Sequence, residues 1–239
     1  MSEMKRLRVR RYEPGVDPRP YWETFTIELR PKLSVLDGLF AVLEQQDGSL
    51  GFRYSCRAGM CGSCAMRIDG REGLACRVRL EHLGEIVTIE PLRSLPVIKD
   101  LLTDMTPFFE KYRRVEPYFV GASPSFATRV LEPERVEPDK PLRKNADRAI
   151  DCISCGACYS ACPTVAANPA YLGPAALNRA LALAADQRDQ DPDRMTLVAG
   201  PDGVYGCRSV GNCVSVCPAG VAPLAAISLL RRGKVARAS

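Results

Sequence analysis

Cysteine is the residue type with the clearest chemistry in this chain, because eleven cysteines occur in 239 residues and they fall in three groups. Closely spaced thiolates bind soft metal centres, and an odd, clustered set of this kind does not suit a disulfide framework. The most regular group lies in residues 152–163 and has the pattern C-x2-C-x2-C-x3-C-P. This spacing is typical of a cubane [4Fe–4S] cluster site.

A second, incomplete run follows in residues 207–218, where Val210 occupies the position of the second cysteine. In bacterial ferredoxins with two runs, the fourth cysteine of each run ligates the cluster of the other. This crossing rule predicts one site with four thiolates and one with three. The [4Fe–4S] ligands would be Cys152, Cys155, Cys158 and Cys217. The other site would hold [3Fe–4S], since an iron corner without its thiolate is readily lost, and its ligands would be Cys162, Cys207 and Cys213.

The third group has the plant-type spacing C-x4-C-x2-C, completed by one more cysteine after a hairpin, and it predicts a [2Fe–2S] site. Its ligands would be Cys56, Cys61, Cys64 and Cys76. Gly59 and Gly62 would let backbone N–H groups approach the sulfurs closely. A zinc ribbon is the alternative for four such cysteines. The three predicted sites use all the cysteines, so no thiol remains for nucleophilic catalysis.

Other residue types narrow the function further. His82 is the only histidine, which excludes Rieske and Cys2His2 zinc sites because both need two. The net charge of +5 is mild and mixed with acidic residues, so a nucleic-acid partner is not expected. We find no phosphate-binding or dinucleotide-binding motif, and the chain is therefore expected to carry electrons rather than to make and break bonds.

No export signal or membrane span is expected. The first residues lack an apolar segment, and no window approaches 18 uninterrupted apolar residues. Reduced thiols without an export signal predict a cytoplasmic protein.

The hydrophobic pattern predicts an α+β fold with two domains. Alternation around residues 6–10 and 24–29 predicts a strand hairpin, and Ser34 is expected to cap a helix that ends near residue 47. Short strands are expected at 65–68, 74–79 and 86–89. This order predicts a β-grasp [2Fe–2S] domain over residues 1–105.

The second predicted domain, residues 106–239, is mainly helical and of the bacterial-ferredoxin type, with the [4Fe–4S] and [3Fe–4S] sites. A helical pattern extends over residues 96–115 and so crosses the domain boundary, and further helices are expected to begin at Pro174 and Pro223. Residues 131–147 are rich in proline and charge and are expected to be extended.

Taken together, the chain resembles the iron–sulfur subunit of succinate dehydrogenase and fumarate reductase, respiratory complex II. The resemblance covers essentially the whole chain, and its most specific stretches are SCRAGMCGSCAMRIDGREGLAC, LPVIKDLLTDM, DCISCGACYSACP, LGPAALNRAL and CVSVCP. It implies an FAD-containing flavoprotein partner, a membrane anchor, and electron transfer through the three clusters to quinone. It also implies a peripheral position on the cytoplasmic face of the cell membrane.

The chain departs from the family pattern at the expected quinone side. Ala166 and Ala167 stand where family members have tryptophans, and Arg208 stands where many have histidine. By the resemblance, quinone would be bound near Pro163, Arg208 and Ser209, whereas an ion pair is the structural alternative for Arg208. Three other functions stay open: quinol:fumarate reduction in the reverse direction, a free-standing multi-cluster ferredoxin, and a zinc-bound interaction module.

Overall fold

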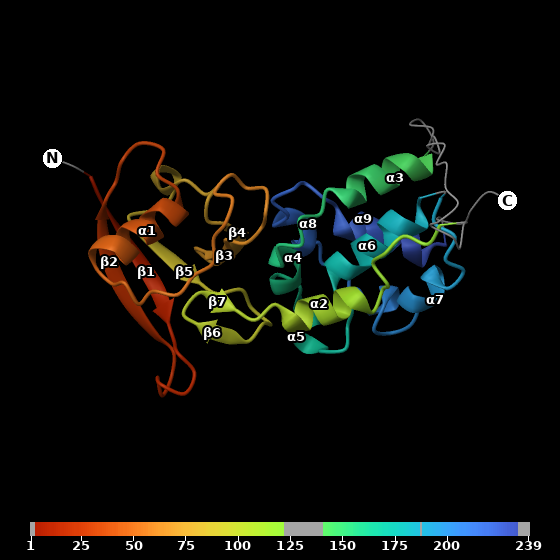
Figure 1. Ribbon diagram of the computed structural model, residues 1–239, viewed down its shortest axis with the longest axis horizontal. Helices are drawn as coiled ribbons and strands as arrows, with labels where there is room; N and C mark the ends of the chain where they lie inside the picture. The colour runs from red at the N-terminus through yellow and green to blue at the C-terminus, as the bar shows by residue number, and fades with distance from the viewer. Residues whose placement is uncertain (1–2, 122–140, 187, 234–239) are drawn as a thin grey trace, which may run out of the picture. The chain divides into compact units, whose positions relative to one another are not determined.

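The structure is a computed structural model that describes residues 3–121, 141–186 and 188–233 (Figure 1). It contains both helices and strands, which confirms the predicted α+β class. The chain divides into two units. The first comprises Met1–Pro107, Ile153–Ala161 and Val216–Pro218, and the second comprises Phe108–Cys152, Cys162–Ser215 and Ala219–Ser239.

The first unit is built on a five-stranded mixed sheet. Its strands are β1 (Met4–Arg11), β2 (Tyr21–Glu28), β3 (Ala65–Ile68), β4 (Arg71–Leu74) and β5 (Ile86–Glu90). They lie in the order β2-β1-β5-β3-β4, with β1 parallel to β5 and the other pairs antiparallel. Leu7 and Val9 of β1 are fully buried, as their alternation with arginines predicts. This is the β-grasp arrangement.

Helix α1 (Val35–Gln45) lies against the sheet (Figure 1). It begins as predicted, because the Ser34 hydroxyl accepts a hydrogen bond from the Asp37 N–H while the Asp37 carboxylate accepts one from the Ser34 N–H. A Cβ at Gly38 would lie only 3.0 Å from side-chain atoms of Leu7 and Ile27, so the missing side chain allows this close approach.

Two predictions for the first unit were wrong. The strand expected at residues 74–79 ends at Leu74, because the chain turns there and the N–H groups of Arg77 and Val78 both donate to the Leu74 carbonyl. The helical pattern predicted over residues 96–115 is wrong for its first half, where the chain forms β6 (Val97–Lys99) and β7 (Leu102–Thr103), and is confirmed for its second half by α2 (Thr106–Arg113).

A buried aspartate explains this second error. Asp100 adopts a positive φ of 49° between β6 and β7, and its carboxylate accepts hydrogen bonds from the Arg11 guanidinium and from the N–H groups of Tyr12 and Gly51. These long-range bonds hold a turn where the local sequence favours a helix.

The second unit is helical. Its helices are α2 (Thr106–Arg113), α3 (Pro141–Ile150), α5 (Pro163–Ala167), α6 (Pro174–Ala184), α7 (Arg194–Val198), α8 (Asn212–Ser215) and α9 (Pro223–Arg231). The first two residues of α2 fall in the first unit, as does the single turn α4 (Ala157–Ser160). Each unit also has a short 3-10 helix among its described residues, η1 (Leu80–His82) in the first unit and η3 (Val204–Gly206) in the second.

Helix α6 is the centre of the helical unit, packed between α3 and α9, and its Leu177 and Leu181 are buried (Figure 1). As predicted, α6 and α9 begin with proline, whose missing N–H costs nothing in the first turn. The extended segment predicted for residues 131–147 is wrong for residues 141–147, which lie in α3, and residues 131–140 lie outside the described residues.

Candidate iron–sulfur sites

The loop of residues 56–64 directs backbone N–H groups at two cysteine sulfurs. Cys56 Sγ accepts hydrogen bonds from the N–H groups of Ala58, Met60 and Cys61 at 3.4, 3.3 and 3.3 Å. Cys61 Sγ accepts two more at 3.5 Å, from Cys56 and Ser63. Donors of this kind stabilise negative charge on sulfur, which is what a thiolate-bound cluster requires.

Three residues of this loop have positive φ angles. Arg57, Gly59 and Gly62 have φ values of 57°, 78° and 76°. Left-handed turns of this kind point successive N–H groups toward one side of a loop. The loop is therefore shaped to surround an anionic group.

The remaining two cysteines of this group, Cys64 and Cys76, are buried. Burial raises the pKa of the Cys64 thiol to about 12, whereas a hydrogen bond from the Ser63 side chain and several backbone N–H groups lower the pKa of Cys61 to about 6. The donor set thus has two exposed, hydrogen-bonded sulfurs and two sulfurs on the core side. It fits a [2Fe–2S] cluster with one edge near the surface.

This loop touches the first cysteine-rich run within the same unit. A Cβ built on Gly62 would lie 2.7 Å from the Cys155 Cβ and 3.0 Å from its Cα, which is closer than real Cβ atoms come. Gly62 lies between Cys61 and Cys64, so the backbone of the predicted two-iron loop is in van der Waals contact with a predicted ligand of the four-iron cluster.

The two downstream runs have the same backbone conformation. Ser154 and Ser209 both adopt positive φ, at 53° and 58°, and Gly156 and Gly211 follow at 81° and 90°. Each run then enters a single helical turn, α4 or α8. Val210 therefore occupies the position that Cys155 has in the first run. Its side chain is 58% exposed.

Three cysteines from both runs gather at one pocket in the helical unit. The pocket has a cavity volume of about 20 Å³ and is lined by Cys162, Cys207, Cys213 and Val210 among other residues. Burial raises the pKa of Cys213 to about 11, and the nearby thiols of Cys162 and Cys207 contribute to the shift. The Ser209 N–H donates to Cys207 Sγ at 3.4 Å. Three thiols and one hydrogen-bond donor at one pocket fit a cluster with three protein ligands.

Three of the four remaining predicted ligands lie in the first unit. Cys155 and Cys158 lie in the first unit, and so does Cys217, although the chain around Cys217 otherwise belongs to the helical unit. Cys152, the fourth predicted ligand, is the last residue of the segment Phe108–Cys152 of the second unit. The assignment of Cys152, Cys155, Cys158 and Cys217 to one four-iron site stays a prediction.

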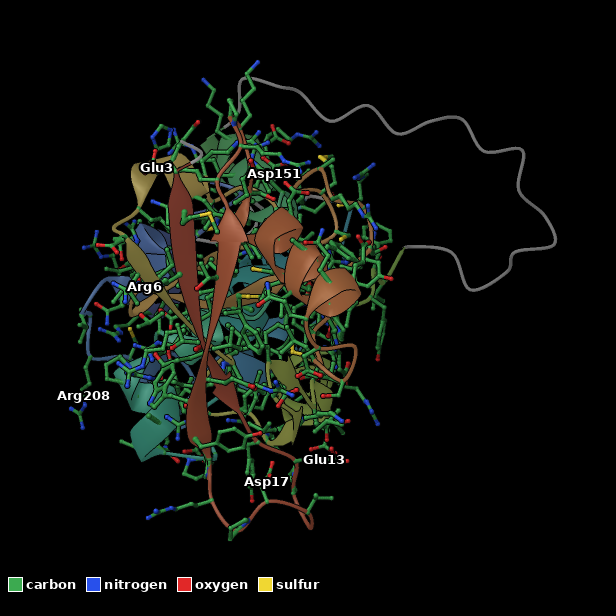
Figure 2. The ribbon with its side chains drawn as sticks, turned by 90° about the vertical axis from the view of Figure 1, so that its left-hand side faces the viewer. Glu3, Arg6, Glu13, Asp17, Asp151 and Arg208 are labelled. Carbon is green, nitrogen blue, oxygen red and sulfur yellow. The ribbon has the colours of Figure 1, made fainter. Side chains whose placement is uncertain are left out.

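The residues predicted for the quinone side also lie at the three-cysteine pocket. Pro163, Arg208 and Ser209 all line it. Arg208 is exposed and its side chain points away from the ribbon (Figure 2). No ion pair of Arg208 is seen with any residue that the structure describes.

Sequence reasoning missed two residues near this pocket. Tyr171 is fully buried and lines it, and Lys111 of α2 is buried within electrostatic range of Cys162. Burial lowers the pKa of Lys111. Neither residue lies in a cysteine motif, so no local spacing could have indicated them.

Comparisons with known proteins identify two iron–sulfur domains in the chain. Residues 6–110 match a family described as a 2Fe-2S iron-sulfur cluster binding domain, and residues 148–221 match a 4Fe-4S dicluster domain. Among solved structures, a chain of the Mycobacterium smegmatis Sdh1 complex in the apo form superposes with a TM-score of 0.78 at 27% identity, covering 100% of both chains.

Curated relatives cover nearly the whole chain. The fumarate reductase iron-sulfur subunit of Mycobacterium tuberculosis is 38% identical over 92% of this chain and 89% of its own length. The corresponding subunit of Haemophilus influenzae is 34% identical over 98% and 93%. The succinate dehydrogenase iron-sulfur subunit of Paracoccus denitrificans is 34% identical over 99% and 90%. The chain therefore belongs to the family of succinate dehydrogenase and fumarate reductase iron–sulfur subunits.

Proposed function

We propose that this chain relays electrons in a succinate:quinone oxidoreductase, from the FAD of a flavoprotein through [2Fe–2S], [4Fe–4S] and [3Fe–4S] clusters to membrane quinone. The [2Fe–2S] ligands are Cys56, Cys61, Cys64 and Cys76. The [4Fe–4S] ligands are Cys152, Cys155, Cys158 and Cys217. The [3Fe–4S] ligands are Cys162, Cys207 and Cys213.

One observation supports this assignment most strongly. Cys162 of the first run and Cys207 and Cys213 of the second line one pocket, and the position that could supply a fourth thiolate holds Val210. The donor set is one sulfur short of a cubane, in a chain that is similar to iron–sulfur subunits of succinate dehydrogenase and fumarate reductase.

When bound, the clusters supply one-electron redox chemistry. The chain's own residues set the conditions for it. Backbone N–H groups around Cys56 stabilise the extra negative charge of the reduced state. The missing side chain of Gly62 keeps the two-iron loop against Cys155, so that the first two sites lie close together.

The partners in this proposal are the FAD-containing flavoprotein, the membrane anchor subunits and quinone, with the chain on the cytoplasmic face of the cell membrane. The relatives' assignment to succinate dehydrogenase and fumarate reductase supports the first two partners. Within the described ranges, no helix is long and apolar enough to cross a bilayer. Pro163, Arg208 and Ser209 are proposed to contact quinone, since they line the pocket of the last cluster.

The reverse reaction, quinol:fumarate reduction, is the second candidate. Its support is that the relatives include fumarate reductase subunits at similar identity. The ligand geometry is the same for either direction, so cluster potentials must decide between them.

Affinity purification of the full chain from detergent-solubilised membranes tests the proposal. We expect a flavoprotein to co-purify, and succinate to reduce the clusters with quinone as final acceptor. Isolation as a free protein without flavin would instead support a free-standing ferredoxin. Zinc in place of iron and sulfide would support an interaction module.

A further inference from the structure

Tyr171 lies in the connection between α5 and α6 and is fully buried, with 0% of its surface exposed. Its backbone is held by a hydrogen bond from its N–H to the Asn168 carbonyl at 3.1 Å, and the next residue, Leu172, donates to Asp202 at 2.7 Å. The ring packs against Gly206. A Cβ on Gly206 would lie 2.9 Å from Tyr171 Cδ2, and Gly206 immediately precedes Cys207.

Within the described residues, the hydroxyl of this buried tyrosine lies near the Cys207 thiol but makes no hydrogen bond of good geometry. Among the residues that the structure describes, no group forms a hydrogen bond of acceptable geometry with Tyr171 Oη. Buried phenols usually find a partner, because an unsatisfied buried polar group lowers stability. An orphaned hydroxyl in an otherwise well-packed position therefore points to a group that binds there.

The surroundings of the hydroxyl identify that group. Tyr171 lines the pocket of Cys162, Cys207 and Cys213. The buried phenol therefore shares its pocket with all three ligands of the last proposed cluster.

We propose that Tyr171 donates an O–H hydrogen bond to a sulfur of the [3Fe–4S] cluster and thereby raises its reduction potential. The inference rests on the proposed function. A donor to cluster sulfur stabilises the reduced, more negative state and makes the cluster a better electron acceptor. Tyr171 is thus a tuning residue for the last step before quinone, and the cluster is the partner that the hydroxyl lacks.

Tyr171→Phe tests this inference, because it removes only the hydroxyl and keeps the ring packed against Gly206. In the intact membrane complex, EPR-monitored redox titration should show a lower midpoint potential for the three-iron centre. The potentials of the other two clusters and the iron content should stay unchanged. Tyr205→Phe is the matched control, because Tyr205 lies two residues before Cys207 but is 61% exposed. This variant should leave the midpoint potentials of all three clusters unchanged.

A second substitution covers the case in which the phenylalanine variant does not assemble its cluster. Fluorotyrosine at position 171 makes the phenol a stronger donor, so the midpoint of the three-iron centre should rise. An unchanged midpoint in either variant with full cluster occupancy would overturn the role of Tyr171 and leave the proposed function intact. Absence of any three-iron signal from the wild-type complex would instead remove the basis of both.

Discussion

Val210 is the single residue on which the proposed cluster composition depends. The two cysteine runs have the same sequence of positive φ angles, at Ser154 and Gly156 and again at Ser209 and Gly211. This shared backbone assigns Val210 to the position of Cys155 independently of the sequence alignment. Because its side chain is largely exposed, a change at Val210 should not disturb the core.

Val210→Cys should therefore supply the missing ligand and convert the three-iron cluster into a cubane. We expect the EPR signal of the oxidised three-iron centre to disappear while iron per chain increases by about one atom. The converted cluster should have a lower potential, and electron delivery to quinone should slow.

Val214→Cys is the control for this variant. Val214 is also exposed and lies on α8, but it does not occupy a ligand position of the run. It should keep the three-iron signal. A folded, fully loaded Val210→Cys protein with the same signal as wild type would contradict the assignment of the vacant position.

At the scale of elements, the two-iron loop packs closely against the first cysteine run at Gly62, which has no side chain to prevent this contact. Alanine at position 62 would destabilise the fold in two ways. It would have to adopt a positive φ, and its Cβ would overlap with the backbone and side chain of Cys155. The positive φ costs about 1–2 kcal/mol and the overlap about 1–3 kcal/mol. Gly62→Ala should thus lower the thermal midpoint of the loaded chain and reduce its iron content.

Gly15→Ala separates these two effects. Gly15 has a similar φ of 85° but nothing within 4 Å of the position of a Cβ, so only the backbone effect applies. The thermal midpoint of Gly62→Ala should fall clearly below that of Gly15→Ala. Equal thermal midpoints and equal iron contents of the two variants would show that the contact with Cys155 does not contribute to stability.

Ser160 of helix α4 forms a hydrogen bond to Glu72 of β4. Ser160 Oγ donates to the buried Glu72 carboxylate at 2.9 Å and accepts from the Arg93 N–H at 2.7 Å. Glu72 also lies 3.5 Å from the Arg67 guanidinium. Ser160 thus connects the four-iron run to the sheet that carries the two-iron loop, and its loss leaves buried groups unsatisfied.

Ser160→Ala should consequently destabilise the protein by about 1–3 kcal/mol, the usual range for an unsatisfied buried polar group. Denaturant unfolding of the loaded chain under anaerobic conditions would measure this. Ser215→Ala removes the same hydroxyl from an exposed position on α8 and should change the free energy of unfolding by less than about 0.5 kcal/mol. A loss for Ser160→Ala no larger than that of the control would contradict the fastening role.

At the scale of the whole molecule, crossed ligation predicts that removing one cysteine of the second run affects the four-iron cluster, whereas removing another affects the three-iron cluster. Cys217 belongs by sequence to the second run, but it lies in the first unit with Cys155 and Cys158. Cys217→Ala should abolish the four-iron cluster and spare the three-iron one, whereas Cys213→Ala should do the reverse. EPR spectra of the two variants would show this directly. Loss of the three-iron signal in Cys217→Ala, with the four-iron signal retained, would mean that each run binds its own cluster.

Much of this architecture could be predicted from sequence, because its signals are local. Leu7 and Val9 alternate with arginines, Ser34 and Asp37 form a capping box, and proline begins α6 and α9. Cysteine spacing likewise reports on single loops. The crossing rule combines the two runs into two ligand sets. These sets stay a prediction, which the shared pocket of Cys162, Cys207 and Cys213 supports.

What could not be predicted depends on distant contacts. The turn at Asp100 is held by Arg11, Tyr12 and Gly51, so the helical pattern around it was misleading. Tyr171 carries no motif, and its importance comes from Gly206 and from thiols that lie far from it in sequence. Such residues emerge only when the chain is folded.

Anaerobic assay of iron and acid-labile sulfide in the purified, fully loaded wild-type complex tests the central claim most directly. A chain with [2Fe–2S], [4Fe–4S] and [3Fe–4S] clusters should contain about nine iron atoms and about ten sulfides. It should also show the EPR signal of an oxidised three-iron centre. About ten irons with ten sulfides, and no three-iron signal, would mean that the last site is a complete cubane and that Val210 does not leave it one thiolate short.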